Sequence, residues 1–193
     1  MKIAIDLDQT IFYCDSLAYN IANKFFQLES KKSLKYSNLN TSFEEPNSLL
    51  YKIIVSNFNV CNYNKYKEVN GSTRAIRYLL SQGHELYYLS KRPNRKIFTN
   101  VVYKWFVEHD IHIENVILNC SNKGGFCKLI NVDVLIDDFQ KTCDFAVKSG
   151  IKVFKFDFKE KDCWDKIIQE IDLLSEKQLQ RSGKSLANNE SLC

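Results

Sequence analysis

The chain has 193 residues, of which 45% are hydrophobic and 26% are charged, and its formal net charge is +4. This length fits one domain, or one domain with a modest insertion, and the composition is that of an ordinary soluble protein with a packed core. The mild positive charge favours an anionic substrate. Because Lys and Arg are scattered among the acids, without the dense basic stripe of a nucleic-acid binder, nucleic acid is a disfavoured partner.

The start of the chain and its cysteines indicate where the protein works. Asp6 and Asp8 interrupt any secretory signal, and no apolar run approaches the roughly 18 to 20 residues of a membrane span. The seven cysteines form an odd set without a CxxC pair, which indicates reduced thiols and disfavours a structural zinc site. We therefore expect a cytoplasmic protein with no membrane partner.

Short apolar segments alternate with helical patterns along most of the chain. Each apolar segment is a continuous run, as expected for a strand buried on both faces. The expected strands are Lys2–Leu7, Glu85–Leu89, Asn115–Leu118, Val132–Ile136 and Lys152–Phe156, and the expected helices are Ser72–Ser81, Arg95–His109, Gly124–Ile130, Phe139–Ser149 and Cys163–Leu174. This alternation predicts an α/β fold with a Rossmann-like, doubly wound parallel sheet of five core strands.

Residues 12–70 interrupt the alternation. Leu17–Leu28 has helical apolar spacing, and a polar stretch and a second apolar patch follow it. We expect a small helical cap inserted after the first strand, so that residues 1–11 and 71–174 form the core. Residues 175–193 are almost entirely polar, and we expect a flexible tail. Packing is the simpler role for Phe25 and Phe26, which lie on a helix with core spacing. Aromatic residues of the insertion that could stack on a planar ligand are Phe12, Tyr13, Phe25, Phe26, Phe43 and Tyr51.

Asp6 and Asp8 stand at the carboxyl end of the first expected strand. Ligands of open α/β sheets bind at this edge. Side chains two apart on a strand share a face, so both carboxylates could meet one ligand if the strand continues. Two such acids repel each other unless a cation lies between them or one is protonated. This pair therefore indicates a metal or catalytic site more than a solvated strand end.

Three further groups follow expected strands or precede them. Ser90 follows Glu85–Leu89, where its hydroxyl could donate to a phosphate oxygen. Asp137 and Asp138 end the buried run Val-Leu-Ile, and carboxylate oxygens there suit magnesium. Lys123 and Lys128 both precede that acidic pair, and their spacing does not choose between them. We favour Lys123, because it opens the short helix and so lies nearer the ligand-binding edge.

Together these residues resemble the haloacid dehalogenase superfamily of phosphatases. The order of the motifs and their placement on strands agree over roughly residues 1–160, and the insertion at residues 12–70 matches the superfamily's helical cap of the first type. The matching positions are Asp6, Asp8 and Thr10 for the Asp-x-Asp-x-Thr motif, Ser90 for the hydroxyl motif, Lys123 for the lysine motif, and Asp137 and Asp138 for the acidic motif.

The resemblance implies a magnesium-dependent phosphomonoester hydrolase that forms an aspartyl-phosphate intermediate. Asp6 would be the nucleophile, and Asp8 would act first as general acid and then as general base. Mg²⁺ would be held by Asp6, the main-chain carbonyl of Asp8 and Asp137.

The remaining motif residues would support this chemistry. Ser90 and Lys123 would bind phosphate oxygens. Thr10 would order the turn that aims the general acid. Asp138 would orient Lys123 or a metal-bound water.

A closer resemblance is to the cytosolic 5'(3')-deoxyribonucleotidase family and its bacterial relatives. Gly71 through Pro93 resembles the family's stretch that leads to Thr-Ala-Arg-Pro, and the chain from Asp137 through Asp157 is also similar. Here the threonine is replaced by Ser90 and the alanine by Lys91, and the added lysine could alter phosphate or leaving-group contacts. The resemblance does not extend to the insertion. It implies a nucleoside monophosphate as the small-molecule substrate.

Other functions stay open at this stage. The same chemistry could act on a sugar phosphate or on a 3'-phosphate end of nucleic acid, although the mild charge and the sizeable cap disfavour a long polymer. A non-catalytic binding protein of the same fold is a third reading, disfavoured because both Asp6 and Asp8 are intact. The sequence does not decide the base, the sugar, or whether the protein is a monomer or a homodimer.

Overall fold

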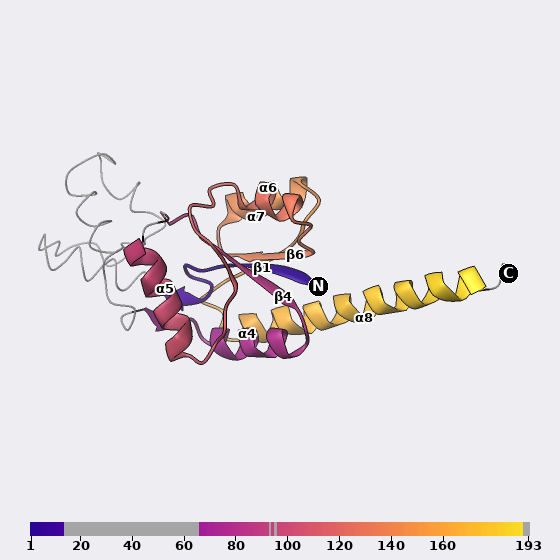
Figure 1. The fold of residues 1–193 in the computed structure, drawn as a ribbon, viewed down its shortest axis with the longest axis horizontal. Coiled ribbons are helices and arrows are strands. Elements are labelled where there is room, and N and C mark those ends of the chain that lie inside the picture. The colour runs from indigo at the N-terminus through magenta and orange to yellow at the C-terminus, as the bar shows by residue number, and fades with distance from the viewer. Residues whose placement is uncertain (14–65, 93, 95, 191–193) are drawn as a thin grey trace, which may run out of the picture.

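The computed structural model describes residues 1–13, 66–92, 94 and 96–190, and a parallel sheet lies at its centre (Figure 1). The sheet has five strands in the order β5-β4-β1-β6-β7. These strands are β1 (Lys2–Asp6), β4 (Glu85–Leu89), β5 (Asn115–Ile117), β6 (Val134–Asp137) and β7 (Lys152–Lys155). The predicted α/β architecture with five parallel core strands is confirmed.

Helices cover both faces of the sheet. Helices α6 (Lys123–Leu129) and α7 (Gln140–Lys148) lie on one face. On the other face lie α4 (Ser72–Ser81), α5 (Lys96–Glu108) and the start of α8 (Cys163–Glu190), as Figure 1 shows. The crossovers from β1 to β4 and from β4 to β5 therefore lie on one face, and those that lead to β6 and to β7 lie on the other, which is the doubly wound arrangement.

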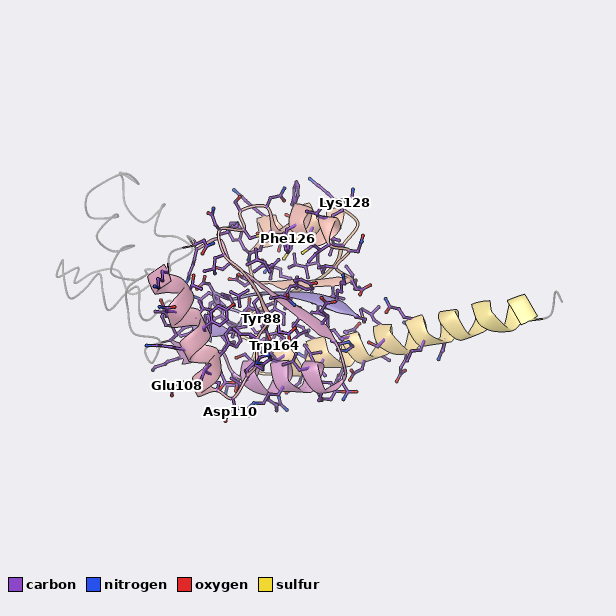
Figure 2. All side chains as sticks on the ribbon, in the orientation of Figure 1. Tyr88, Glu108, Asp110, Phe126, Lys128 and Trp164 are labelled. Carbon is purple, nitrogen blue, oxygen red and sulfur yellow. The ribbon has the colours of Figure 1, made fainter. Side chains whose placement is uncertain are left out.

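The strands are apolar throughout because both of their faces are buried. In β1, Ile3 and Ile5 pack into the larger core cluster under α4, α5 and α8, whereas Ala4 packs into the smaller cluster under α6 and α7. Tyr88 and Trp164 lie inside the larger cluster (Figure 2). This two-sided burial explains why the strands read as continuous apolar runs and not as alternating ones.

The two ends of the insertion are joined by a short antiparallel ribbon. Strand β2 (Phe12–Tyr13) pairs with β3 (Lys67–Glu68). Phe12 is buried and packs edge-on against Trp105 of α5, with ring centroids 4.5 Å apart. Phe12 is therefore a core residue and not a base-stacking one. The expected helix Leu17–Leu28 and the aromatic residues Phe25, Phe26, Phe43 and Tyr51 lie outside the described residues, so the helical cap stays a prediction.

Helix α8 continues beyond its expected end. We predicted that it would stop at Leu174, where the apolar spacing is lost, but the helix runs on to Glu190 and leaves the body of the domain (Figure 1). The reason is that Glu, Lys, Gln and Arg are good helix formers even where nothing is buried, and Leu179 is 74% exposed. The flexibility expected of this tail stays a prediction. Among the described helices, none is both long and apolar enough to cross a membrane.

Candidate active site

The strand register brings two of the predicted aspartates together. Asp6 ends β1, and Asp137 ends the adjacent parallel strand β6, in which Ile136 is the partner of Ile5. Ala4 and Leu135 both face α6 and α7, so the alternation of side chains turns Asp6 and Asp137 toward the same helices. Both carboxyl groups are buried.

Lys123 bridges these two aspartates. It is the first residue of α6, and its Nζ lies 2.6 Å from Asp6 Oδ1 and 2.7 Å from Asp137 Oδ2. Burial alone would lower the pKa of Lys123, but the two carboxylates raise it by more, so the pKa lies above its ordinary value and the amine stays charged. Lys128 is exposed and points away from the sheet on the outer side of α6 (Figure 2). The structure thus selects Lys123 over Lys128 as the lysine at this edge.

Asp6 is held in position by backbone as well as by Lys123. The amide of Leu7 donates to Asp6 Oδ1 at 2.8 Å. Burial raises the pKa of Asp6 well above its ordinary value, Lys123 opposes that rise, and the neighbouring aspartates Asp137, Asp138 and Asp8 add to it. Four carboxyl groups, those of Asp6, Asp8, Asp137 and Asp138, thus lie together with the cations Lys123 and Arg92.

Asp137 and Asp138 have different surroundings from those expected. Both oxygens of Asp137 are engaged, Oδ2 by Lys123 and Oδ1 by the amide of Phe139 at 2.9 Å. Asp138 is less buried and interacts with the carboxyl group of Asp6. Burial and then the charge of Asp137 raise the pKa of Asp138 to about 6. These contacts favour Asp137 as the residue that orients Lys123 and Asp138 as the carboxylate that faces Asp6.

The residues present suit a hard divalent cation. Oxygen atoms of Asp6, Asp137 and Asp138 all lie within 4.8 Å of one another. Three carboxyl groups here share the single positive charge of Lys123, and burial followed by the neighbouring charges raises the pKa of Asp6 and of Asp138. Carboxylate oxygens are the ligands that Mg²⁺ prefers, so an added cation would relieve the repulsion within the cluster.

The chain turns sharply after β1, so Asp8 does not continue the strand. Gln9 has a left-handed backbone (φ 61°), and its amide donates to the carbonyl of Phe12 at 2.7 Å. The amides of Ile11 and Phe12 both donate to the carbonyl of Leu7. In the described part of the chain, the buried hydroxyl of Thr10 meets no hydrogen-bond partner. Backbone hydrogen bonds therefore shape this turn, and the expected part of the Thr10 hydroxyl in it stays a prediction.

Arg92 binds Asp8, a contact that we did not expect from the sequence. Its guanidinium forms an ion pair with Asp8 Oδ1, and its Nε donates to Asp8 Oδ2 at 2.8 Å. Ser90, which follows β4, is fully buried, and its Oγ donates to Asp8 Oδ2 at 3.4 Å and accepts from the amide of Arg92 at 3.1 Å. The sequence does show an arginine two residues after Ser90. One arginine in a loop does not reveal which carboxylate it binds.

Arg92 is itself fixed by its neighbours. Its Nη1 donates to the hydroxyl of Tyr66 at 3.0 Å, and the guanidinium lies 5.0 Å from the centroid of the Tyr66 ring. The amide of Asn119 donates to the carbonyl of Arg92 at 2.7 Å. A guanidinium held on several sides loses little freedom when it binds a carboxylate through two hydrogen bonds. The orientation of Asp8 is therefore set by a rigid partner.

Gly124 allows α6 to approach α7 closely. A Cβ atom on Gly124 would lie 2.8 Å from the Phe145 ring, closer than real Cβ contacts, and 3.0 Å from the Cα of Ala146, tighter than most of them. A larger residue would push α6 outward and move the adjacent Lys123. The Lys-Gly sequence is thus a packing requirement of the site.

Comparisons with known proteins agree with this architecture. No family model and no curated protein sequence matches the chain. Among solved structures, a haloacid dehalogenase-like hydrolase from Streptococcus pneumoniae matches with a TM-score of 0.60 and 13% identity, covering 80% of this chain and 83% of that one. A Thermotoga maritima protein named as a β-phosphoglucomutase matches with a TM-score of 0.55 and 14% identity, covering 80% and 84%.

A third match is a haloacid dehalogenase family hydrolase from Deinococcus radiodurans, whose structure holds phosphate and sodium. Its TM-score is 0.52 at 9% identity, over 79% of this chain and 78% of that one. The chain has a haloacid dehalogenase-like fold. At these identities the haloacid dehalogenase-like likeness establishes architecture alone, and the chemistry must be argued from the side chains at the edge of the sheet.

Proposed function

We propose that the protein is a phosphomonoester hydrolase in which Asp6 is the nucleophile. The observation that carries this proposal is the bridge from Lys123 to Asp6 and Asp137, which fixes a buried carboxylate at the ligand-binding edge of the sheet. A simple structural ion pair would need one carboxylate. Here Asp138 adds a third carboxyl group to the cluster, and a bound cation would balance its charge.

In the first step, an Asp6 carboxylate oxygen attacks phosphorus and forms an aspartyl-phosphate, while the bond from phosphorus to the leaving oxygen breaks. The ammonium group of Lys123 contacts Asp6. From there it would also pair with an oxygen of the phosphate that Asp6 attacks. The hydroxyl of Ser90 is a second donor at this edge. Asp137 keeps the ammonium group of Lys123 oriented through its 2.7 Å contact.

Asp8 is the general acid of the first step and the general base of the second. It gives a proton to the leaving oxygen in the first step and takes one from the attacking water in the second, when the bond from phosphorus to Asp6 breaks. Its contact with Arg92 holds the carboxyl group beside Ser90.

Asp6 and Asp138 are the residues we propose to hold Mg²⁺, with the main-chain carbonyl of Asp8 as a further expected ligand. When bound, the ion would supply positive charge against the phosphate and its transition state. The support for this role is the shared negative charge of the aspartate cluster and the engagement of both Asp137 oxygens by other groups.

For the substrate, we propose a small phosphomonoester, with a (deoxy)nucleoside 5'-monophosphate as the first candidate. This choice is supported by the sequence resemblance around residues 71–93 and 137–157. A sugar phosphate is the second candidate, supported by the fold likeness to the protein named as a β-phosphoglucomutase. A 3'-phosphate end of nucleic acid and a non-catalytic binding role are the remaining alternatives.

The test is hydrolysis of p-nitrophenyl phosphate and a panel of nucleotides and sugar phosphates, with Mg²⁺ and with EDTA. We expect turnover that needs Mg²⁺ and is lost in Asp6→Asn. Preference for a sugar phosphate over every nucleotide would reject the nucleotidase choice and leave the phosphatase. Absence of turnover of every compound by folded protein would contradict the proposed function itself.

A further inference from the structure

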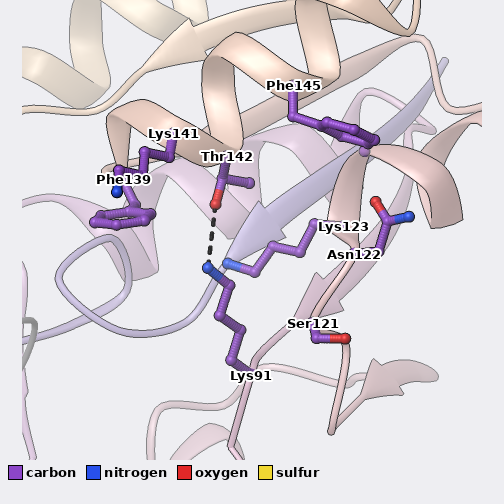
Figure 3. A pocket seen from close by; sticks show the side chains of 9 residues that line it. Lys91, Ser121, Asn122, Lys123, Phe139, Lys141, Thr142 and Phe145 are labelled. Carbon is purple, nitrogen blue, oxygen red and sulfur yellow. Dashed lines mark hydrogen bonds between the residues drawn. The ribbon is translucent and has the colours of Figure 1, made fainter. Parts of the chain in front are cut away.

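A pocket of about 400 Å³ opens beside the proposed phosphate site, between the segment after β4 and the first turns of α6 and α7. We call it the lysine pocket. Its lining includes Lys91, Lys123, Lys141, Thr142, Phe139 and Phe145. Figure 3 shows the ammonium ends of Lys91 and Lys123 reaching into it. A volume of this size is in the usual range for small-molecule sites.

The charge of the lysine pocket is unbalanced. Three lysines line it, and no acid does among the described residues. Lys123 is neutralised by Asp6 and Asp137. Lys91 contacts the hydroxyl of Thr142 at 3.4 Å and lies 4.7 Å from the centroid of the Phe139 ring, and neither contact supplies negative charge. In the part of the chain that the structure describes, neither Lys91 nor Lys141 forms an ion pair.

This imbalance indicates the chemistry of a ligand. Lysine side chains of like charge that line one concavity raise its positive potential and attract an anion. The Thr142 hydroxyl, largely buried and within reach of Lys91, adds a hydrogen-bonding group. Phe139 and Phe145 supply an apolar wall for a carbon skeleton. The pocket therefore offers two uncompensated ammonium groups and one hydroxyl to a small anionic molecule.

The lysine pocket also adjoins the reacting group. Lys123 lines it and at the same time contacts Asp6 at 2.6 Å. Phe139 directly follows Asp138, and its amide donates to Asp137. One ligand can therefore occupy the lysine pocket while its phosphate faces the nucleophile.

We propose that the lysine pocket binds a second anionic group of the substrate, so that the substrate is a small phosphomonoester that also carries a phosphate or a carboxylate. Of the candidates above, this favours a sugar phosphate with a second acidic group over a nucleoside 5'-monophosphate, whose single phosphate is the group that reacts. This inference rests on the proposed phosphatase function, because it takes Asp6 as the place where the first phosphate reacts. Lys91 and Lys141 are the specificity-determining residues, and they contact the group that does not react.

The test compares matched compounds that differ by one anionic group. Fructose 1,6-bisphosphate against fructose 6-phosphate tests a second phosphate, and 3-phosphoglycerate against glycerol 3-phosphate tests a carboxylate. At fixed Mg²⁺ and ionic strength, we expect kcat/KM to favour the bis-anionic member of at least one pair by about tenfold or more, the scale of one charge-assisted contact. Lys91→Ala and Lys141→Ala should each reduce that preference.

Lys148→Ala is the matched control, because it removes a charge from the exposed end of α7 outside the lysine pocket. It should keep the wild-type preference. Equal kcat/KM within each pair, or a preference that survives in the Lys91→Ala/Lys141→Ala double variant, would overturn the inference and leave the phosphatase proposal standing.

Calorimetry with the same four compounds separates the two proposals if no compound is turned over. Tighter binding of a bis-anionic compound, lost in Lys91→Ala but not in Lys148→Ala, would retain the anion site while the phosphatase proposal fails. Equal binding of both members of each pair would overturn the anion site as well.

Discussion

The guanidinium of Arg92 contacts both carboxylate oxygens of Asp8, a residue 84 positions earlier in the sequence. The backbone amide of Arg92 also donates to the hydroxyl of Ser90. The residue proposed as general acid is thus held by the same short segment that supplies the hydroxyl proposed to bind phosphate. The first residue after β4 and the third residue after it act on one carboxyl group.

Replacing Arg92 should change the dependence of the rate on the leaving group. In Arg92→Ala, Asp8 loses its orienting partner, so kcat for an alkyl phosphate should fall by about 10²-fold, on the scale of general acid–base catalysis. Hydrolysis of p-nitrophenyl phosphate, whose leaving group needs no proton, should fall much less. Arg92→Lys, which keeps the charge but not the two-pronged contact, should lie between. Equal losses on both substrates would indicate a structural role alone.

Asp6→Asn should abolish turnover while the protein stays folded. A carboxamide is a poor nucleophile, and losses of about 10³-fold or more are expected when a covalent catalyst is removed. Because burial disfavours the ionised carboxylate in the folded state, its removal should leave the melting temperature equal or slightly higher. Rapid-quench detection of a phosphorylated enzyme should succeed for wild type and fail for this variant. Residual activity within tenfold of wild type would reject Asp6 as nucleophile.

The two adjacent aspartates should differ in their effect on metal dependence. Asp138→Asn should raise the Mg²⁺ concentration for half-maximal activity by more than about tenfold, since it removes the carboxylate that faces Asp6. Asp137→Asn should lower activity at saturating Mg²⁺, because Lys123 loses an orienting partner. Titration of activity with Mg²⁺ distinguishes the two. The opposite pattern would restore Asp137 as the metal ligand and Asp138 as the orienting group.

Lys123→Ala should damage both activity and stability. Two buried carboxylates lose their partner, which typically costs about 3–5 kcal/mol in the free energy of unfolding. Mg²⁺ should recover part of that stability, but the lost phosphate contact should keep the variant inactive. Lys128→Ala, on the exposed side of the same helix, should match wild type in urea unfolding and in kcat. A large loss in Lys128→Ala would show that the outer face of α6 takes part in function.

Trp105→Ala should unfold the region that joins the insertion to the core. Trp105 is buried, its ring packs against Phe12, and its indole N–H donates to the carbonyl of Tyr66 at 2.8 Å. The expected loss in the free energy of unfolding is about 3–5 kcal/mol. Trp105→Phe keeps most of the packing and loses the hydrogen bond, so it should lose less. Urea titrations of both variants measure the difference.

The sheet could be predicted from the sequence because strands buried on both faces are continuous apolar runs. Glu85–Leu89 and Ser72–Ser81 have the expected bounds, and the other four core strands and the helices α5, α6 and α7 agree within one or two residues at each end. The short strands β2 and β3 were not expected. The end of α8 was wrong, because its polar residues form a helix without the apolar spacing that marks a buried one.

The sequence predicted which residues gather at the candidate site. It did not predict which of them contact one another. Parallel strands that end at one edge bring Asp6 and Asp137 together, and order along the chain places Lys123 there. The partner of Asp8 was not predictable, because the contact with Arg92 depends on a sharp turn at Gln9 and on the position of Tyr66. The division of roles between Asp137 and Asp138 likewise depends on which oxygens the backbone engages.

The antiparallel pairing of Phe12–Tyr13 with Lys67–Glu68 holds the first and last residues of the insertion side by side. Its two ends meet at adjacent strands, so the core does not constrain how long the chain between them is. The entropy of closing such a loop grows only logarithmically, by about 0.6 kcal/mol for each doubling of length. One insertion can therefore be exchanged for another at little cost to folding, so the proposed recognition of the leaving group could diverge while the residues of the proposed active site are retained.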